Sequence, residues 1–180
     1  MPRLGTARVR ILGMADITVR PLTEEEWDQY RSVRLAALQE SPQAFVASYD
    51  EEADYDEDFW RLRMRRSQRL LAEIDGEAVG TASVGEVDTD DGCHAELFGL
   101  WVSPALRGKG IATKLVSAGA RSARENGNSH LYYWVGTDNG RAVAFASGFG
   151  FRPTDQRRPV RVESEEDGPE EIAMVLSLAE

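Results

Sequence analysis

The chain has 180 residues, of which 42% are hydrophobic, and it carries a formal net charge of −10. A chain of this length and apolar content can bury one sizeable core, so we expect one domain. The negative charge disfavours nucleic acid as a partner, because a phosphate backbone would be repelled rather than neutralised. No segment reaches the roughly 18 to 20 consecutive apolar residues that a membrane span needs, which predicts a cytoplasmic protein with no membrane partner.

Cysteine and histidine are too scarce to build a metal site of the usual spacing. The sequence holds one cysteine, Cys93, and two histidines, His94 and His130. A lone cysteine excludes an internal disulfide, and two histidines make no cluster with metal-ligand spacing. We therefore predict that the protein binds no metal.

The first residues carry no fold signal. Residues 1–13 show no clear periodicity, and Met14 offers an alternative start. We treat residues 1–13 as a leader, non-native or disordered, and residues 14–180 as the folded domain.

Helix and strand signals alternate through the first half of the chain. Thr23, followed by three glutamates, is typical of a helix N-cap with an acidic first turn, and Pro42 ends that helix. The Asp75-Gly76 pair is typical of a tight hairpin turn. The predicted elements are a strand (17–20), two helices (24–39 and 57–67) and a hairpin (69–74 and 78–87).

The second half begins with an apolar strand that leads into a helix. Residues 97–102 form a strand-like run ended by Pro104, and residues 111–124 show helical spacing with a stop at Asn126-Gly127. A strand at 131–135 completes a right-handed strand-helix-strand crossover. The predicted elements that follow are a helix after Asn139, a strand from Phe151 onward and a strand at 172–178.

The run Arg107-Gly108-Lys109-Gly110 lies between that strand and that helix. Its two glycines let the backbone turn tightly and direct several N–H groups to one point. The following helix adds the positive end of its dipole, and the arginine and lysine add full charges. These features predict a cradle for a pyrophosphate. The run lacks the glycine and hydroxyl spacing of a P-loop and the third glycine of the dinucleotide fingerprint.

The cradle resembles the Arg-x-x-Gly-x-Ala signature of the GNAT N-acetyltransferases, read here as Arg107, Gly110 and Ala112. Downstream, the run from Asn139 to Phe145 and the later Gly150-Phe151 pair resemble the second motif of that family. The resemblance covers about residues 95–152. It implies the GNAT fold, an α/β (α+β) layout with a mixed sheet of about seven strands, helices on both faces and a splayed pair of parallel strands.

The resemblance also implies acetyl-CoA as cosubstrate. By resemblance, the N–H of Leu100 polarises the thioester carbonyl and Val102 pairs with the pantetheine amides. Gly99 marks a β-bulge that frees those groups, or is a glycine tolerated for packing. The expected cofactor-binding residues are Leu100, Trp101, Val102, Arg107, Gly108, Lys109, Gly110, Ile111, Ala112, Thr113, Asn139, Ala142 and Phe145.

Acetyl transfer to an amine requires a group that removes a proton from the ammonium. Glu96 lies where certain family members carry their general base. The alternative interpretation is that Glu96 is an ordinary exposed glutamate at the end of a strand. The usual general acid of the family is a tyrosine seven residues after the motif asparagine, and that position here is Ala146. Proton donation to the thiolate then falls to water, to Ser147, or is not needed.

Acceptor recognition is expected from the early helices, where Phe45, Tyr49 and Tyr55 lie among acidic residues. Aromatic rings and carboxylates suit an ammonium-bearing acceptor. Five arginines between residues 61 and 69 follow at once, and ion pairs with them would neutralise the acidic side chains. The expected partner is a small-molecule or peptide amine, and a homodimer is left open.

The main hypothesis is an acetyl-CoA-dependent N-acetyltransferase that acts on a primary amine by direct attack on the thioester. The alternative is a noncatalytic acyl-CoA-binding or sensing domain, which Ala146 favours. A third hypothesis is a phosphate-binding module without preference for coenzyme A.

Overall fold

The computed structural model describes residues 16–45, 47–90, 92–159 and 170–179. These residues form a seven-stranded sheet of order β1-β2-β3-β4-β5-β7-β6, in which β4 and β5 are parallel and the other neighbours antiparallel. The strands are β1 (Ile17–Pro21), β2 (Gln68–Ile74), β3 (Glu77–Thr89), β4 (Gly92–Val102), β5 (His130–Gly136), β6 (Arg152–Pro159) and β7 (Glu170–Ser177). The helices are α1 (Trp27–Glu40), α2 (Tyr49–Ala53), α3 (Glu57–Arg66), α4 (Ile111–Glu125) and α5 (Gly140–Phe149).

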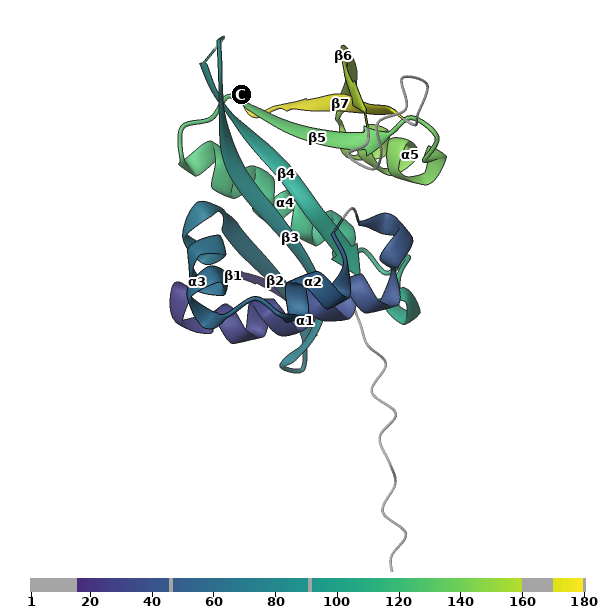
Figure 1. Ribbon diagram of the computed structural model, residues 1–180. Coiled ribbons are helices and arrows are strands. Elements are labelled where there is room, and N and C mark those ends of the chain that lie inside the picture. Colours follow the sequence, from purple (N-terminus) through teal and green to yellow (C-terminus); the bar gives the residue numbers. More distant parts are fainter. Residues whose placement is uncertain (1–15, 46, 91, 160–169, 180) are drawn as a thin grey trace, which may run out of the picture.

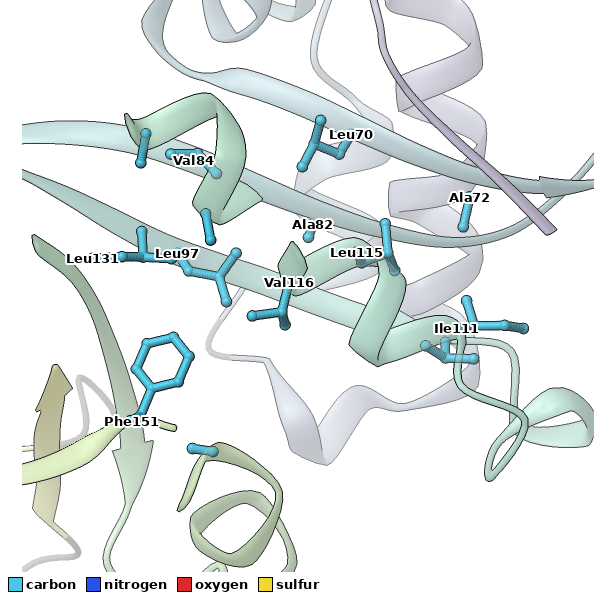
Figure 2. Close-up of a cluster of buried hydrophobic side chains, with 14 of the residues drawn as sticks. Leu70, Ala72, Ala82, Val84, Leu97, Ile111, Leu115, Val116, Leu131 and Phe151 are labelled. Atoms are coloured by element: carbon cyan, nitrogen blue, oxygen red, sulfur yellow. The ribbon is translucent and has the colours of Figure 1, made fainter. Parts of the chain in front are cut away.

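Helices cover both faces of the sheet, as predicted. Helices α1, α2 and α3 lie in front of the β1–β4 half in Figure 1, and α4 lies behind it. The side chains of Ile111, Leu115 and Val116 on α4 pack against Leu70, Ala82, Val84 and Leu97 of the strands (Figure 2). A second cluster fills the opposite face, with Tyr30, Leu38, Trp60, Leu71 and Trp101 at its centre. The sheet is therefore buried on both sides near β4.

Two local differences from the sequence prediction have physical causes. The first helix begins at Trp27 because Glu24–Glu26 form a 3-10 turn, closed by a capping box between Thr23 and Glu26. Helix α2 was not predicted, since its five residues are too few to show helical periodicity, although Ser48 accepts a hydrogen bond from the Glu51 N–H as its N-cap.

The predicted hairpin is confirmed, and its second strand is longer than expected. Asp75 and Gly76 both have positive φ, 51° and 80°, which matches the two-residue turn that the pair predicts.

No helix in the described ranges is long and apolar enough to cross a membrane. The predicted leader, residues 1–13, lies outside the described residues.

Candidate functional site

The parallel pairing of β4 with β5 is short. The paired residues are Ala95 with Leu131, Glu96 with Tyr132, and Leu97 with Tyr133. Beyond them the two strands diverge (Figure 1). The splayed parallel pair is therefore present. Among the described residues, none pairs with β4 from Phe98 to Val102 along the edge that faces β5.

A β-bulge lies at the point where β4 leaves β5. Ser83 pairs with Phe98 and Thr81 pairs with Trp101, so both Gly99 and Leu100 face the single residue between them on β3. Gly99 has φ +62°, a region that side chains other than glycine rarely adopt. A Cβ at Gly99 would meet nothing closer than 3.8 Å, so the backbone angle, and not packing, requires glycine here.

The bulge resets the alternation of β4. Leu97, Leu100 and Val102 belong to the cluster on the α4 side, whereas Trp101 belongs to the cluster under α1 and α3. Without the extra residue, a strict period of two would turn Leu100 to the α1 side. The expectation of a bulge at Gly99 is therefore confirmed.

The cradle follows β4 directly. Gly108 and Gly110 have φ +79° and +85°, and Gly110 is the N-cap of α4. Within the described chain, no side chain caps this end and its first turn holds no acidic residue. The first intrahelical bond runs from the Lys114 N–H to the Gly110 carbonyl, which leaves the N–H groups of the first turn for an anion.

A cavity of about 450 Å³ opens over this helix end and the free edge of β4. Its lining brings together ten of the thirteen expected cofactor-binding residues: Leu100, Trp101, Val102, Arg107, Gly108, Gly110, Ile111, Ala112, Thr113 and Phe145. Arg107 Nε donates to the Val102 carbonyl at 3.1 Å, and its Nη2 lies 3.4 Å from Ser41 Oγ. We name this space the donor cavity.

The other three expected residues lie outside that lining. Lys109 is exposed in the cradle turn. Asn139 caps α5, where its Oδ1 accepts the Ala142 N–H at 3.1 Å. The capping role of Asn139 is thus confirmed, and a contact with the pantetheine arm stays a prediction.

Glu96 faces a second cavity of about 590 Å³ on the α1–α3 side of β4, which we name the acceptor cavity. Glu96 also lines a smaller cavity of about 330 Å³ with His94, Tyr132 and Trp134. Its carboxylate is half-buried and three residues from the bulge. The donor and acceptor cavities share Ala44, and the two residues of the bulge divide between them: Leu100 lines the donor cavity and Gly99 lines the acceptor cavity.

Of the three predicted acceptor residues, one lines the acceptor cavity. Phe45 is in the lining, and the Arg34 guanidinium lies over its ring at 4.9 Å. Tyr49 and Tyr55 are outside it, and the Tyr55 hydroxyl donates to Glu51 at 3.3 Å. The lining also contains four arginines and a serine that the sequence analysis did not select as acceptor residues: Arg34, Arg63, Arg69, Arg158 and Ser83.

The acidic cluster does not make the acceptor cavity acidic. Glu52 is 2% exposed and accepts two hydrogen bonds from Arg34, at 3.1 and 3.0 Å, and one from Arg63. Burial raises the pKa of Glu52, but the hydrogen bonds from both arginines outweigh it and hold that pKa below its ordinary value. Arg61 pairs with Glu57 at 2.8 Å. The sequence analysis expected ion pairs between the acidic cluster and the arginines that follow it. These pairs are present, and they neutralise part of the cluster.

Comparison with known families identifies the chain. The model of the Acetyltransferase (GNAT) family matches residues 19–151, which span the front helices, the bulge and the cradle. The chain belongs to the GNAT acetyltransferase family.

Individual GNAT relatives are distant. An uncharacterized N-acetyltransferase of Methanocaldococcus jannaschii is 23% identical over 74% of this chain and 60% of its own length. An uncharacterized N-acetyltransferase of Archaeoglobus fulgidus is 34% identical over 56% of this chain and 67% of its own length. The chain therefore spans about three fifths to two thirds of these relatives.

Solved GNAT structures share the fold. A putative acetyltransferase of Salmonella typhimurium, solved with acetyl-CoA, has a TM-score of 0.67 at 20% identity, covering 92% of this chain and 95% of its own. A GNAT-family acetyltransferase of Streptococcus pneumoniae has a TM-score of 0.71 at 15% identity, covering 91% of this chain and 99% of its own. Both confirm the predicted fold.

This GNAT chain departs from the family pattern at the general-acid position. Ala146 is fully buried in the core and offers no proton. Ser147 is exposed in the last turn of α5 and lines neither the donor nor the acceptor cavity. Tyr133 packs against Phe151, and burial raises the pKa of its phenol.

Among the described residues no group of three His, Cys, Asp or Glu could hold a metal, and metal independence stays a prediction.

Proposed function

We propose that this GNAT protein transfers an acetyl group from acetyl-CoA to a primary amine of a small molecule or a peptide. One observation carries the proposal: the bulge at Gly99 separates a donor cavity, built on the α4 N-terminus, from an acceptor cavity that Glu96 lines. A thioester held along β4 would therefore present its carbonyl carbon beside the bulge, between Leu100 of the donor cavity and Gly99 of the acceptor cavity.

The donor cavity fits the chemistry of coenzyme A. The N–H groups at the start of α4, with Arg107 and Lys109, suit the pyrophosphate. The free edge of β4 suits the pantetheine amides, which would add as a further strand. Arg107 now donates to the Val102 carbonyl, so engagement of a phosphate by Arg107 would release that carbonyl for an amide N–H.

Glu96 is the residue that we assign as general base. An alkylamine with a pKa near ~10 is mostly protonated at neutral pH, so its surplus proton must leave before the nitrogen can attack. Glu96 accepts that proton directly or through a water molecule, a role worth about 10²- to 10⁴-fold in rate. The Leu100 N–H then donates to the carbonyl oxygen as negative charge develops on it.

The step balances without a protein acid. The neutral nitrogen attacks the carbonyl carbon and releases its second proton to water as the amide bond forms, while the carbon–sulfur bond breaks and the sulfur leaves with the electron pair. Because a thiol has a pKa of only about 8.5, the thiolate is a competent leaving group and takes its proton from water. We therefore assign the proton to water, since Ser147 lines neither cavity.

The test combines binding with turnover. Calorimetry should show that acetyl-CoA binds the wild-type protein and Glu96→Gln equally, and that ADP binds much more weakly. Thiol release with a broad amine panel should fall about 100-fold or more in Glu96→Gln. The matched control, Glu125→Gln at the exposed end of α4, should keep full activity.

Two results would overturn the proposal. Binding of acetyl-CoA without turnover of any amine, unchanged in Glu96→Gln, would establish the noncatalytic acyl-CoA-binding domain that the buried Ala146 favours. Equal affinity for ADP and acetyl-CoA would remove the argument for the pantetheine arm.

A further inference from the structure

Arg69 is a buried guanidinium on β2, and it is 4% exposed. Its Nε and Nη2 donate to the Arg63 carbonyl at 3.3 and 3.0 Å, and its Nη1 donates to Ser83 Oγ at 2.8 Å. Over the part of the chain that the structure describes, no carboxylate forms an ion pair with it within 4.0 Å. A buried charge without a counter-ion is costly, so this position calls for an anion.

Two further arginines leave the same region positive. Arg34 and Arg63 both bind the single carboxylate of Glu52. Arg34 and Arg63 therefore share one carboxylate, and Arg69 pairs with none within 4.0 Å among the described residues. The acidic side chains of the lining are Glu51, which accepts from Tyr55, Glu171, which pairs with Arg158 at 2.8 Å, and Glu96.

The unused donors point to the reaction centre. Arg34 binds Glu52 through Nε and Nη2, and its Nη1 lies 4.0 Å from the position that a Cβ would take on Gly99. Ser83 Oγ lies 3.8 Å from the same point and touches Arg69. The donors of three elements, α1, β2 and β3, thus converge beside the bulge.

We propose that the acceptor amine carries a carboxylate, which Arg34, Arg69 and Ser83 bind while its amino group faces Glu96. This inference rests on the proposed function and names the acceptor class, a free amino acid. A guanidinium pairs with a carboxylate through two parallel N–H···O bonds, which fixes the orientation of the ligand. A zwitterion offers opposite charges to Glu96 and to the arginines, whereas a simple polyamine would place a cation beside Arg69.

Matched substrates test the proposal. Thiol release from acetyl-CoA would be measured for a panel of L-amino acids, each paired with its amide and with the amine that lacks the carboxyl group. The kcat/KM of the acids should exceed that of their amides by about 10- to 100-fold, the usual effect of a hydrogen-bonded charge.

Variants show whether these arginines cause the preference. Arg34→Gln should remove most of the preference by raising KM for acids and leaving KM for amides nearly constant. Arg69→Gln should have the same effect if the variant folds. If Arg69→Gln does not fold, Arg34→Gln alone tests the proposal, because Glu52 keeps its ion pair with Arg63 in that variant. Arg61→Gln, on α3 and paired with Glu57, is the control that should keep the preference.

The outcomes separate the two proposals. Equal kcat/KM for acids and amides would overturn this inference and leave the acetyltransferase proposal standing. Absence of turnover with every amine would overturn the acetyltransferase proposal, and calorimetry would then decide on the carboxylate. With coenzyme A present, an N-acetylamino acid should bind at least about tenfold more tightly than its amide, and equal affinities would refute the carboxylate site.

Discussion

Replacement of Gly99 by alanine tests whether the bulge serves the donor cavity. A non-glycine residue at φ +62° costs about 1–2 kcal/mol of strain, and the less flexible unfolded chain returns about 0.4–1 kcal/mol of that. Because a Cβ at Gly99 would meet nothing closer than 3.8 Å, no clash adds to the strain. We expect Gly99→Ala to lower the stability by about 0.5–1 kcal/mol, or Tm by about 1–4 °C for a chain of this size.

The effect of Gly99→Ala on catalysis should be larger than its effect on stability. Relief of the strain requires a change in φ, which turns the next N–H, that of Leu100, away from the donor cavity. Loss of one such donor to a developing oxyanion costs about 10²–10³ in kcat, so a partial misalignment should cost at least about tenfold.

Gly127→Ala is the matched control for this experiment. Gly127 has φ +86°, an added Cβ there would meet nothing within 4 Å, and the residue follows α4 far from both cavities. Its Tm should fall as in Gly99→Ala, with kcat unchanged. Equal kcat for the two variants, measured by thiol release at saturating substrates, would refute the role of the bulge.

Three more predictions test other parts of the molecule. Glu52→Gln should cost about 3 kcal/mol or more in denaturant unfolding, because two half-buried arginines lose their partner. Since the folded-state pKa of Glu52 lies below its ordinary 4.5, the difference in stability from wild type should shrink as the pH falls below 4.5. A difference that stays constant down to about pH 3 would contradict this prediction. Lys109→Ala should raise KM for acetyl-CoA about three- to tenfold at constant kcat, with less effect at high salt, whereas a salt-independent change would not fit a charge contact. Gly80→Ala would place a Cβ 2.9 Å from the Trp101 carbonyl oxygen and 3.2 Å from Leu115, and should destabilise the protein by about 1–3 kcal/mol in the same unfolding assay, while Gly140→Ala, in open space, should not.

The donor side of the site was predictable because its signals are local. The cradle glycines, the helix that follows and the strand that precedes lie within one continuous stretch, residues 97–124, and each signal indicates the same crossover. The position of the bulge was predictable, since Gly99 interrupts an apolar strand. Its pairing partners on β3 were not predictable, because they come from a distant segment of the chain.

The acceptor side was not predictable, because its residues come together only through tertiary structure. Arg34, Arg63 and Arg69 belong to α1, α3 and β2, and no pattern in one segment joins them. One signal was present in the sequence. Because side chains alternate between the two faces of a strand, Arg69 lies on the same face as Leu71, and that face is covered by the helices. An arginine on a face that must be covered is a candidate buried charge.

Composition also failed to separate Glu52 from its acidic neighbours. Glu51, Glu52 and Asp54 are alike in sequence, yet helix α2 turns only Glu52 toward Arg34 and Arg63. The choice of Tyr49 and Tyr55 depended on the same unpredicted helix, and only Phe45, which precedes it, lines the acceptor cavity.

The division of the bulge between the two cavities, Leu100 in one and Gly99 in the other, also divides the chain. The donor cavity is lined mainly by β4, the cradle and α4, and the acceptor cavity is lined mainly by the front helices and the strands beneath them. If the proposed function holds, substitutions in the front helices would change the compound that is acetylated and leave the binding of the thioester intact. A new acceptor specificity would then need changes in the acceptor cavity alone.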